Sequence, residues 1–102
     1  MKNRARRYSK EWLIKNEEWD LKFSRKIKEE LHGYCEQDNK LMCIAYGQNM
    51  LETFATLIHE SWHGYEKEFK KTVNHQAMHV LDTWTALWIL ENWDKIKSIV
   101  ED

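Results

Sequence analysis

Residues 54–66 read FATLIHESWHGYE, and this stretch decides the fold of the chain. From Gln48 onward, apolar side chains recur every three or four residues, the spacing that places them on one face of an α-helix. The stripe consists of Leu51, Phe54, Ile58, Trp62, Tyr65 and Phe69. The pattern predicts a helix over residues 48–70, with Leu57 and Ile58 burying it under a sheet.

The middle of this helix carries a metal-binding pattern, His59-Glu60-Ser61-Trp62-His63. Residues four apart lie one turn apart, so both imidazoles can reach a single ion. Imidazole suits zinc, although nickel, cobalt or copper would also bind such a set. Glu60 points aside, where its carboxylate can act as general base toward a metal-activated water. The alternative is that two surface histidines and a glutamate share one helix face by chance.

A catalytic zinc ion takes three protein ligands, so a third is expected elsewhere in the chain. Asn74 predicts the N-terminal cap of a second helix. His75, His79 and Asp82 follow at i, i+4 and i+7, on one face of that helix. We assign the third-ligand role to His75. His79 and Asp82 are alternative ligands, groups that orient a ligand or the substrate, or polar residues held between packed helices.

The residues before the first helix predict β-structure over residues 18–46. Trp19, Leu21 and Phe23 alternate with polar residues, which is typical of a strand with one buried face, and Ile27 is expected to continue it. With the helix at 48–70 and a helical region at 75–100, the chain is expected to be α+β. A small antiparallel or mixed sheet would pack on the metal-binding helix and on the C-terminal helix.

Residues 32–46 are expected to form a hairpin around a polar turn. A turn centred near Asn39 would place Cys35 roughly opposite Cys43. A disulfide between them is conceivable, but in a reducing compartment we expect two free thiols.

Composition limits the remaining possibilities. The 102 residues form a single domain, 1–102, with 16 basic and 17 acidic side chains, so no broad charge favours nucleic acid or a membrane. The two cysteines are too few for a disulfide-stabilised secreted scaffold, and no apolar run approaches the length of a signal peptide or a membrane span. Both observations favour the cytoplasm. Residues 1–10 carry several basic residues and no acid, and we expect a flexible arm there.

The stretch 54–66, with the alternating strand before it, resembles SprT-like and other minimal zinc metallopeptidases, which are small phage and bacterial proteins. The residues His75 to Asp82 are similar to the opening of the last helix in that family. The resemblance implies a minimal zincin-like fold, peptide hydrolysis with Zn²⁺, His75 as third ligand and Asp82 as a trailing acid. It also implies an edge strand, Leu41 to Tyr46, that aligns an extended peptide. Ser61 and Trp62 depart from the aliphatic pair common in such motifs.

We therefore expect a zinc metallopeptidase of the host or bacterial cytoplasm, with Glu60 as general base and His59, His63 and His75 as ligands. Its partner would be a peptide or protein substrate. The alternative is a catalytically weak or inactive zinc-binding protein, for instance a phage protein, that docks on a host protein. Nucleic-acid binding through the basic arm is the least favoured reading. Trp84, Trp88 and Trp93 serve either a core or a dimer contact, and the oligomeric state stays open.

Overall fold

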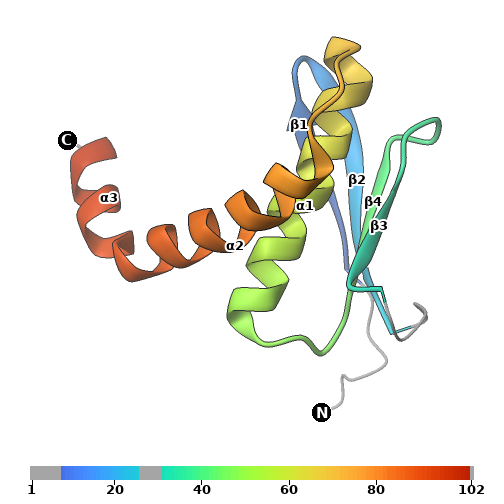
Figure 1. Cartoon of the computed structure of the whole chain (residues 1–102). Coiled ribbons are helices and arrows are strands. Elements are labelled where there is room, and N and C mark those ends of the chain that lie inside the picture. The colour runs from blue at the N-terminus through green and yellow to red at the C-terminus, as the bar shows by residue number, and fades with distance from the viewer. Residues whose placement is uncertain (1–7, 26–30, 102) are drawn as a thin grey trace.

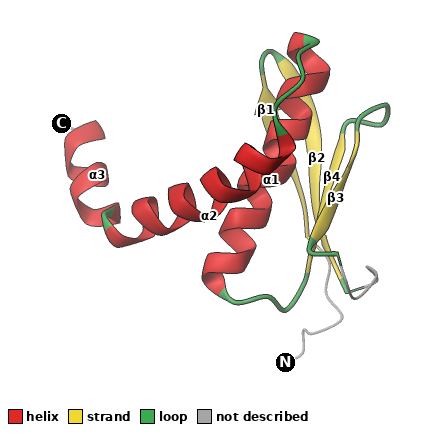
Figure 2. Cartoon of the chain, in the orientation of Figure 1, coloured by secondary structure: helices red, strands yellow, loops and turns green. Residues whose placement is uncertain are grey.

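The computed structural model describes residues 8–25 and 31–101 and shows an α+β fold with strands first and helices last (Figures 1 and 2). The expected fold class is confirmed at this level. The strands are β1 (Tyr8–Ile14), β2 (Glu17–Ser24), β3 (Gly33–Glu36) and β4 (Leu41–Ala45). The helices are α1 (Met50–Phe69), α2 (His75–Glu91) and α3 (Trp93–Val100).

The four strands form one mixed sheet in the order β1-β2-β4-β3. β1 pairs with β2 and β3 with β4 in antiparallel fashion, whereas β2 and β4 run parallel. β2 and β4 are therefore the inner strands. The predicted edge strand Leu41 to Tyr46 is wrong: β4 receives hydrogen bonds from both sides, and β3 is the edge strand beside it.

One face of the sheet makes the core, as the alternation in β2 predicted. Trp19, Leu21, Met42 and Ile44 are almost fully buried there. Phe23 packs at the border of this cluster, and the predicted continuation to Ile27 lies outside the described residues. Because successive strand residues point to opposite faces, the inner strands contribute every second side chain to the core.

The start of the described chain differs from the flexible arm that was expected for residues 1–10. Residues 8–10 belong to β1, where they pair with residues 21–23 of β2, so they are not a flexible arm; residues 1–7 lie outside the described part. The hairpin turns at Lys15, which adopts a positive φ of 60°. Non-glycine residues rarely adopt this conformation. Because a lysine and not a glycine occupies the position, the turn could not be recognised from the sequence.

The predicted hairpin at residues 32–46 is confirmed, with a small change of register. Tyr34 lies opposite Cys43, and Cys35 lies opposite Met42. The two cysteines therefore point to opposite faces of the sheet. Both cysteines are reduced thiols that no disulfide joins, as expected.

The side of α1 that faces the sheet differs from the apolar stripe of the sequence. The buried residues of α1 are Thr56, Glu60 and Gly64, and Phe69 of the stripe is 43% exposed. Small side chains explain the difference, because they let the helix approach the strands. A Cβ on Gly64 would meet the side chains of Ile14 and Trp19. Leu57 packs against the core cluster as expected, beside this face.

The second helix begins where its predicted capping residue, Asn74, placed it. The Asn74 side chain accepts a hydrogen bond of 2.9 Å from the Ala77 backbone N–H, and Asn92 is the C-cap. α2 crosses α1 and then runs away from the sheet, carrying α3 at its far end (Figure 1). None of the helices in the described ranges combines the length and apolarity needed to cross a bilayer.

Candidate metal centre

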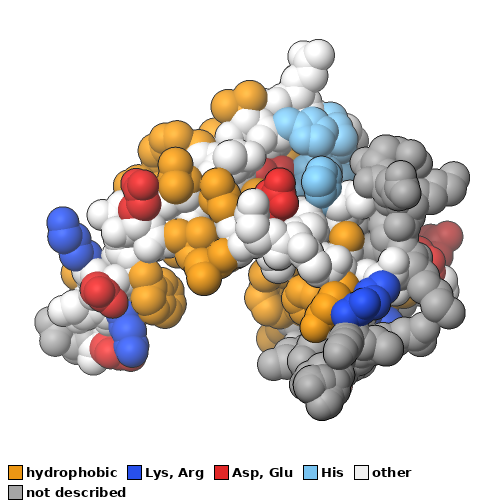
Figure 3. All heavy atoms as spheres, turned by 90° about the horizontal axis from the view of Figure 1, so that it is seen from below, with side chains coloured by type: hydrophobic (Ala, Val, Ile, Leu, Met, Phe, Trp, Pro, Cys, Tyr) orange, Lys and Arg blue, Asp and Glu red, His pale blue; other side chains and the backbone are white. Residues whose placement is uncertain are grey.

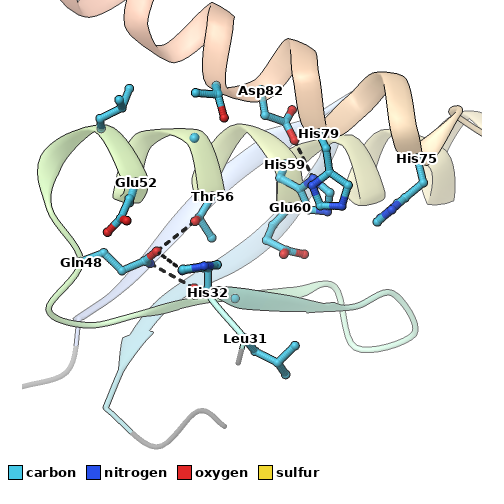
Figure 4. Close-up of a pocket in the computed structure, with 14 residues that line it drawn as sticks. Leu31, His32, Gln48, Glu52, Thr56, His59, Glu60, His75, His79 and Asp82 are labelled. Carbon is cyan, nitrogen blue, oxygen red and sulfur yellow. Dashed lines mark hydrogen bonds and ion pairs between the residues drawn. The ribbon is translucent and has the colours of Figure 1, made fainter. Parts of the chain in front are cut away.

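Most of the predicted site residues lie where α1, α2 and β3 meet, and Figure 4 labels His59, Glu60, His75 and His79 there. α1 supplies His59, Glu60 and His63 from its middle turns. α2 supplies His75 and His79 from its first two turns. The reversal at residues 70–74 returns the chain toward the motif, and Lys70 ends α1 in the left-handed conformation with φ 55°.

Three imidazoles gather most closely. One ring nitrogen from each of His59, His75 and His79 can be chosen so that all three lie within 4.8 Å of one another. The ring centroids are 4.9 Å apart for His59 and His75, 4.8 Å for His59 and His79, and 4.7 Å for His75 and His79. Imidazole nitrogens at this spacing can hold a metal ion, and zinc bonds nitrogen at about 2.0–2.1 Å.

His63 is the fourth imidazole of this cluster. Its ring centroid lies 5.1 Å from that of His59 and 5.5 Å from that of His75. The structure therefore brings together all the predicted histidine ligands. The ring of His79 lies as close to the rings of His59 and His75 as those two lie to each other, which suits a ligand better than a residue that only orients one.

Asp82 orients His59 and is not itself a member of the imidazole cluster. Its Oδ2 lies 2.6 Å from His59 Nδ1, and its side chain is 4% exposed. Because Nδ1 is engaged, the other nitrogen, Nε2, is the one left to bind a metal. Asp82 Oδ1 is buried without a hydrogen-bond partner among the described residues. A buried unpaired carboxylate oxygen is costly, and a cation nearby would offset that cost.

Glu66 orients His63 in the same way, and sequence reasoning missed it. Its Oε1 lies 2.8 Å from His63 Nδ1, and its Oε2 accepts a 2.8 Å bond from the Val73 backbone N–H. Burial alone would raise the pKa of Glu66, but these two bonds bring it below its ordinary value. The i,i+3 spacing of His63 and Glu66 was the available signal; the bond to Val73 needed the loop.

Glu60 lies on the sheet side of the helix, as Figure 4 shows, and is 5% exposed. Burial, the largest cause, raises its pKa to about 7, while His63 opposes the rise and Asp82 adds to it. Gly33 of β3 approaches closely, since a Cβ there would lie 3.5 Å from Glu60 Cγ. The carboxyl is thus held between helix and edge strand.

Burial also lowers the pKa of His59, although Asp82 works in the opposite direction by favouring the charged form. A lowered pKa keeps the imidazole neutral near pH 7, which is the state that binds metals. The position of His59 between the two helices therefore suits it for ligation.

Two pockets meet at the motif, because both are lined by Gly33, His59 and Glu60. The larger has a volume of about 470 Å³ and extends toward the start of α1, past Thr56 and Gln48. The smaller, about 400 Å³, extends along β3 toward His63.

The larger pocket also contains the fifth histidine, His32. Its Nδ1 lies 2.8 Å from the side-chain oxygen of Gln48, which also accepts a bond from the Thr56 hydroxyl. This network fixes the loop before α1. His32 is not part of the close imidazole group in the described residues.

Cys35 lines the smaller pocket but is no candidate nucleophile. Burial, with smaller contributions from nearby glutamates, raises the pKa of its thiol to about 12. The thiol stays protonated at neutral pH, and the thiolate is the reactive and metal-binding form.

No protein-family model, curated protein or solved structure matches the chain. The resemblance to SprT-like proteins therefore rests on the motif residues alone.

Proposed function

We propose that the protein is a zinc-dependent metallopeptidase of the minimal zincin type. One observation carries the proposal: imidazoles from two helices converge beside a buried glutamate at the middle of α1. The arrangement has the residue types and the roles that metal-assisted peptide hydrolysis requires.

The donor set fits zinc. His59 and His75 would be ligands, and the distances favour His79 over His63 as the third. Asp82 and Glu66 support the cluster from behind by holding Nδ1 of His59 and His63. When bound, zinc would polarise a carbonyl and lower the pKa of water.

Glu60 would handle the protons of the reaction. Its carboxylate would take a proton from the attacking water and pass it to the leaving amine. Burial raises its pKa to about 7, near the value that suits a group that both accepts and donates a proton.

The edge strand β3 would align the substrate. β3 lies at the end of the sheet and lines both pockets beside Glu60. An extended peptide could add to this edge through backbone hydrogen bonds, which gives affinity with little demand on sequence. The strand that takes this role is β3 and not the Leu41 to Tyr46 strand.

A second function has support from the number of imidazoles. If His63 and His79 both bind with His59 and His75, four protein ligands close the coordination shell, which is typical of structural zinc. The protein would then be a zinc-stabilised binding module without hydrolytic activity.

The test is hydrolysis of an unfolded, fluorescence-quenched protein by the zinc-loaded chain. Glu60→Gln should abolish cleavage and keep both fold and zinc, because glutamine is nearly isosteric and removes only the ionisable group. Glu91→Gln, an exposed glutamate at the end of α2 that lines neither pocket, is the matched control and should stay active. Equal activity of Glu60→Gln and the parent would refute the enzymatic proposal. A parent that binds zinc but never cleaves would favour the binding module.

A further inference from the structure

The outward face of α2 is apolar and exposed. Five large side chains lie on it, with exposed fractions of 70% for Val80, 51% for Leu81, 59% for Trp84, 41% for Leu87 and 47% for Trp88. Figure 3 shows hydrophobic side chains spread along the helical part of the molecule, between its charged end and the histidine cluster. We call these five side chains the α2 outer face; they take no part in the candidate metal centre.

The opposite face of α2 already packs on the body of the protein. Met78, Asp82 and Ala86 are buried and follow each other at intervals of four residues. At 100° per residue, Trp84 lies about 160° from Asp82, on the other side of the helix. α2 is therefore apolar on both sides, although its own chain covers only one. A helix that is apolar all round is normally buried all round.

The α2 outer face carries no charge. Between residues 80 and 90 the only ionisable residue is Asp82, which is buried against His59. The rings of Trp84 and Trp88 stack on each other, with centroids 6.3 Å apart and planes at 17°. Leu81, Trp84 and Trp88 are spaced by three and four residues, the spacing by which one helix packs along another.

The exposed area matches what a dimer needs. The five side chains leave on the order of 400 to 500 Å² of apolar surface accessible. A standard interface uses about 800 Å² per partner, and about 65% of a homodimer interface is apolar, which requires roughly 500 Å². The patch is also as large as the largest apolar patches of typical monomers, which are often functional.

We propose that the α2 outer face pairs with the same face of a second copy, forming a two-fold symmetric dimer with the two metal centres outside the contact. In a two-fold contact the same surface of both copies comes together, so any charge on it would lie near a like charge. The α2 outer face carries no charge and avoids this repulsion. The net charge of −1 adds none. An interface with a different protein normally uses charged groups to fix the alignment of the two surfaces and to exclude wrong partners. The α2 outer face has no such groups.

A membrane surface is the other occupant that an apolar helix face can have, and the sequence of α2 argues against it. Helices that lie on anionic membranes carry lysine or arginine on their polar side. Residues 75–91 contain neither.

The test is sedimentation equilibrium of the full chain from about 1 to 200 µM. The parent should be a dimer at the upper end of this range. Trp84→Glu and Trp88→Glu should each raise the dissociation constant by at least about 30-fold, because a central indole contact is lost and a charge is buried in its place. Leu13→Glu replaces a side chain that is 66% exposed on β1, and this control should leave the dimer intact.

Far-ultraviolet circular dichroism of each variant would establish that it folds, and Trp84→Phe should retain most of the dimerisation. A parent that stays monomeric at 200 µM would overturn the proposal. A dimer that both glutamate variants leave unchanged would also overturn it, because the contact would then lie elsewhere. Binding of a monomeric parent to phosphatidylcholine vesicles would assign the face to a membrane instead. Zinc loading is measured separately, so a failed dimer leaves the proposed function untouched.

Discussion

The body of the protein, made of the sheet and α1, contrasts with the arm made of the far half of α2 and of α3. Trp19 in the body is 1% exposed, whereas Trp84 in the arm is 59% exposed. α3 has no buried residue at all, and an isolated helix of its length is marginal in water. The same residue type thus closes a core in one region and leaves an open surface in the other.

The candidate metal centre therefore lies at the junction of a well-packed region and a largely exposed one. His59 and His63 come from the body, and His75 and His79 from the first turns of α2. A metal ion bound by both helices would fasten the arm to the body, so metal binding and the order of the arm are expected to be coupled.

The largest expected difference compares two tryptophans. Trp19→Ala should lower the free energy of unfolding by about 3 to 5 kcal/mol, because it empties a filled core site. It also removes the 2.9 Å bond from the indole N–H to Glu68. Trp84→Ala should change it by no more than about 0.5 kcal/mol in dilute protein, where copies do not pair. Urea unfolding of both variants measures the difference, and equal losses would break the distinction between body and arm.

Two glycines give a smaller contrast within the body. A Cβ on Gly33 would lie 2.7 Å from the Cys43 carbonyl oxygen, so Gly33→Ala should cost about 1 to 3 kcal/mol. At Gly64 the nearest atom is the end of the flexible Ile14 side chain, and alanine also favours a helix by about 1 kcal/mol. Gly64→Ala should therefore be nearly neutral. Thermal unfolding compares the two variants. A neutral Gly33→Ala would show that β3 can move away from both β4 and α1 at little cost.

The smallest effect concerns the residues that cap α2 and α3. Asn74→Ala removes the side-chain bond to the Ala77 N–H and should cost about 1 kcal/mol. Asn92→Ala is the control, since its side chain makes no cap bond to α3 and only donates to the Trp88 carbonyl, so the loss should stay within about 0.5 kcal/mol. Zinc titration of Asn74→Ala should also show weaker binding, because His75 follows the cap directly. Unchanged affinity would mean that the start of α2 is held by other contacts.

Local patterns predicted part of this structure well. The alternation around Trp19, the helical spacing near His59 and the cap at Asn74 each act within a few residues, and the structure confirms all three. The α+β class followed from their order.

The remaining features depend on contacts between distant residues. The sheet order places β4 inside and β3 at the edge, and no local pattern reports this order. The hairpin at Lys15 lacks a glycine, so β1 was not recognised as starting at residue 8. Glu60 faces the sheet because Gly64 and Thr56 allow a close approach, which outweighs the apolar stripe on the other side. Hydrophobicity alone could not tell that Trp84 stays uncovered.

Whether α1 and α2 share a metal centre is decided by the zinc content of purified protein, measured by elemental analysis after reconstitution for the parent and single histidine variants. We predict one zinc per chain in the parent and in His32→Ala, and loss of zinc in His59→Ala on α1 and in His75→Ala on α2. Comparison of His63→Ala with His79→Ala then distinguishes an open three-ligand site from a closed one. A parent without zinc, or a His75→Ala variant that keeps it at full affinity, would contradict a metal centre shared by the two helices.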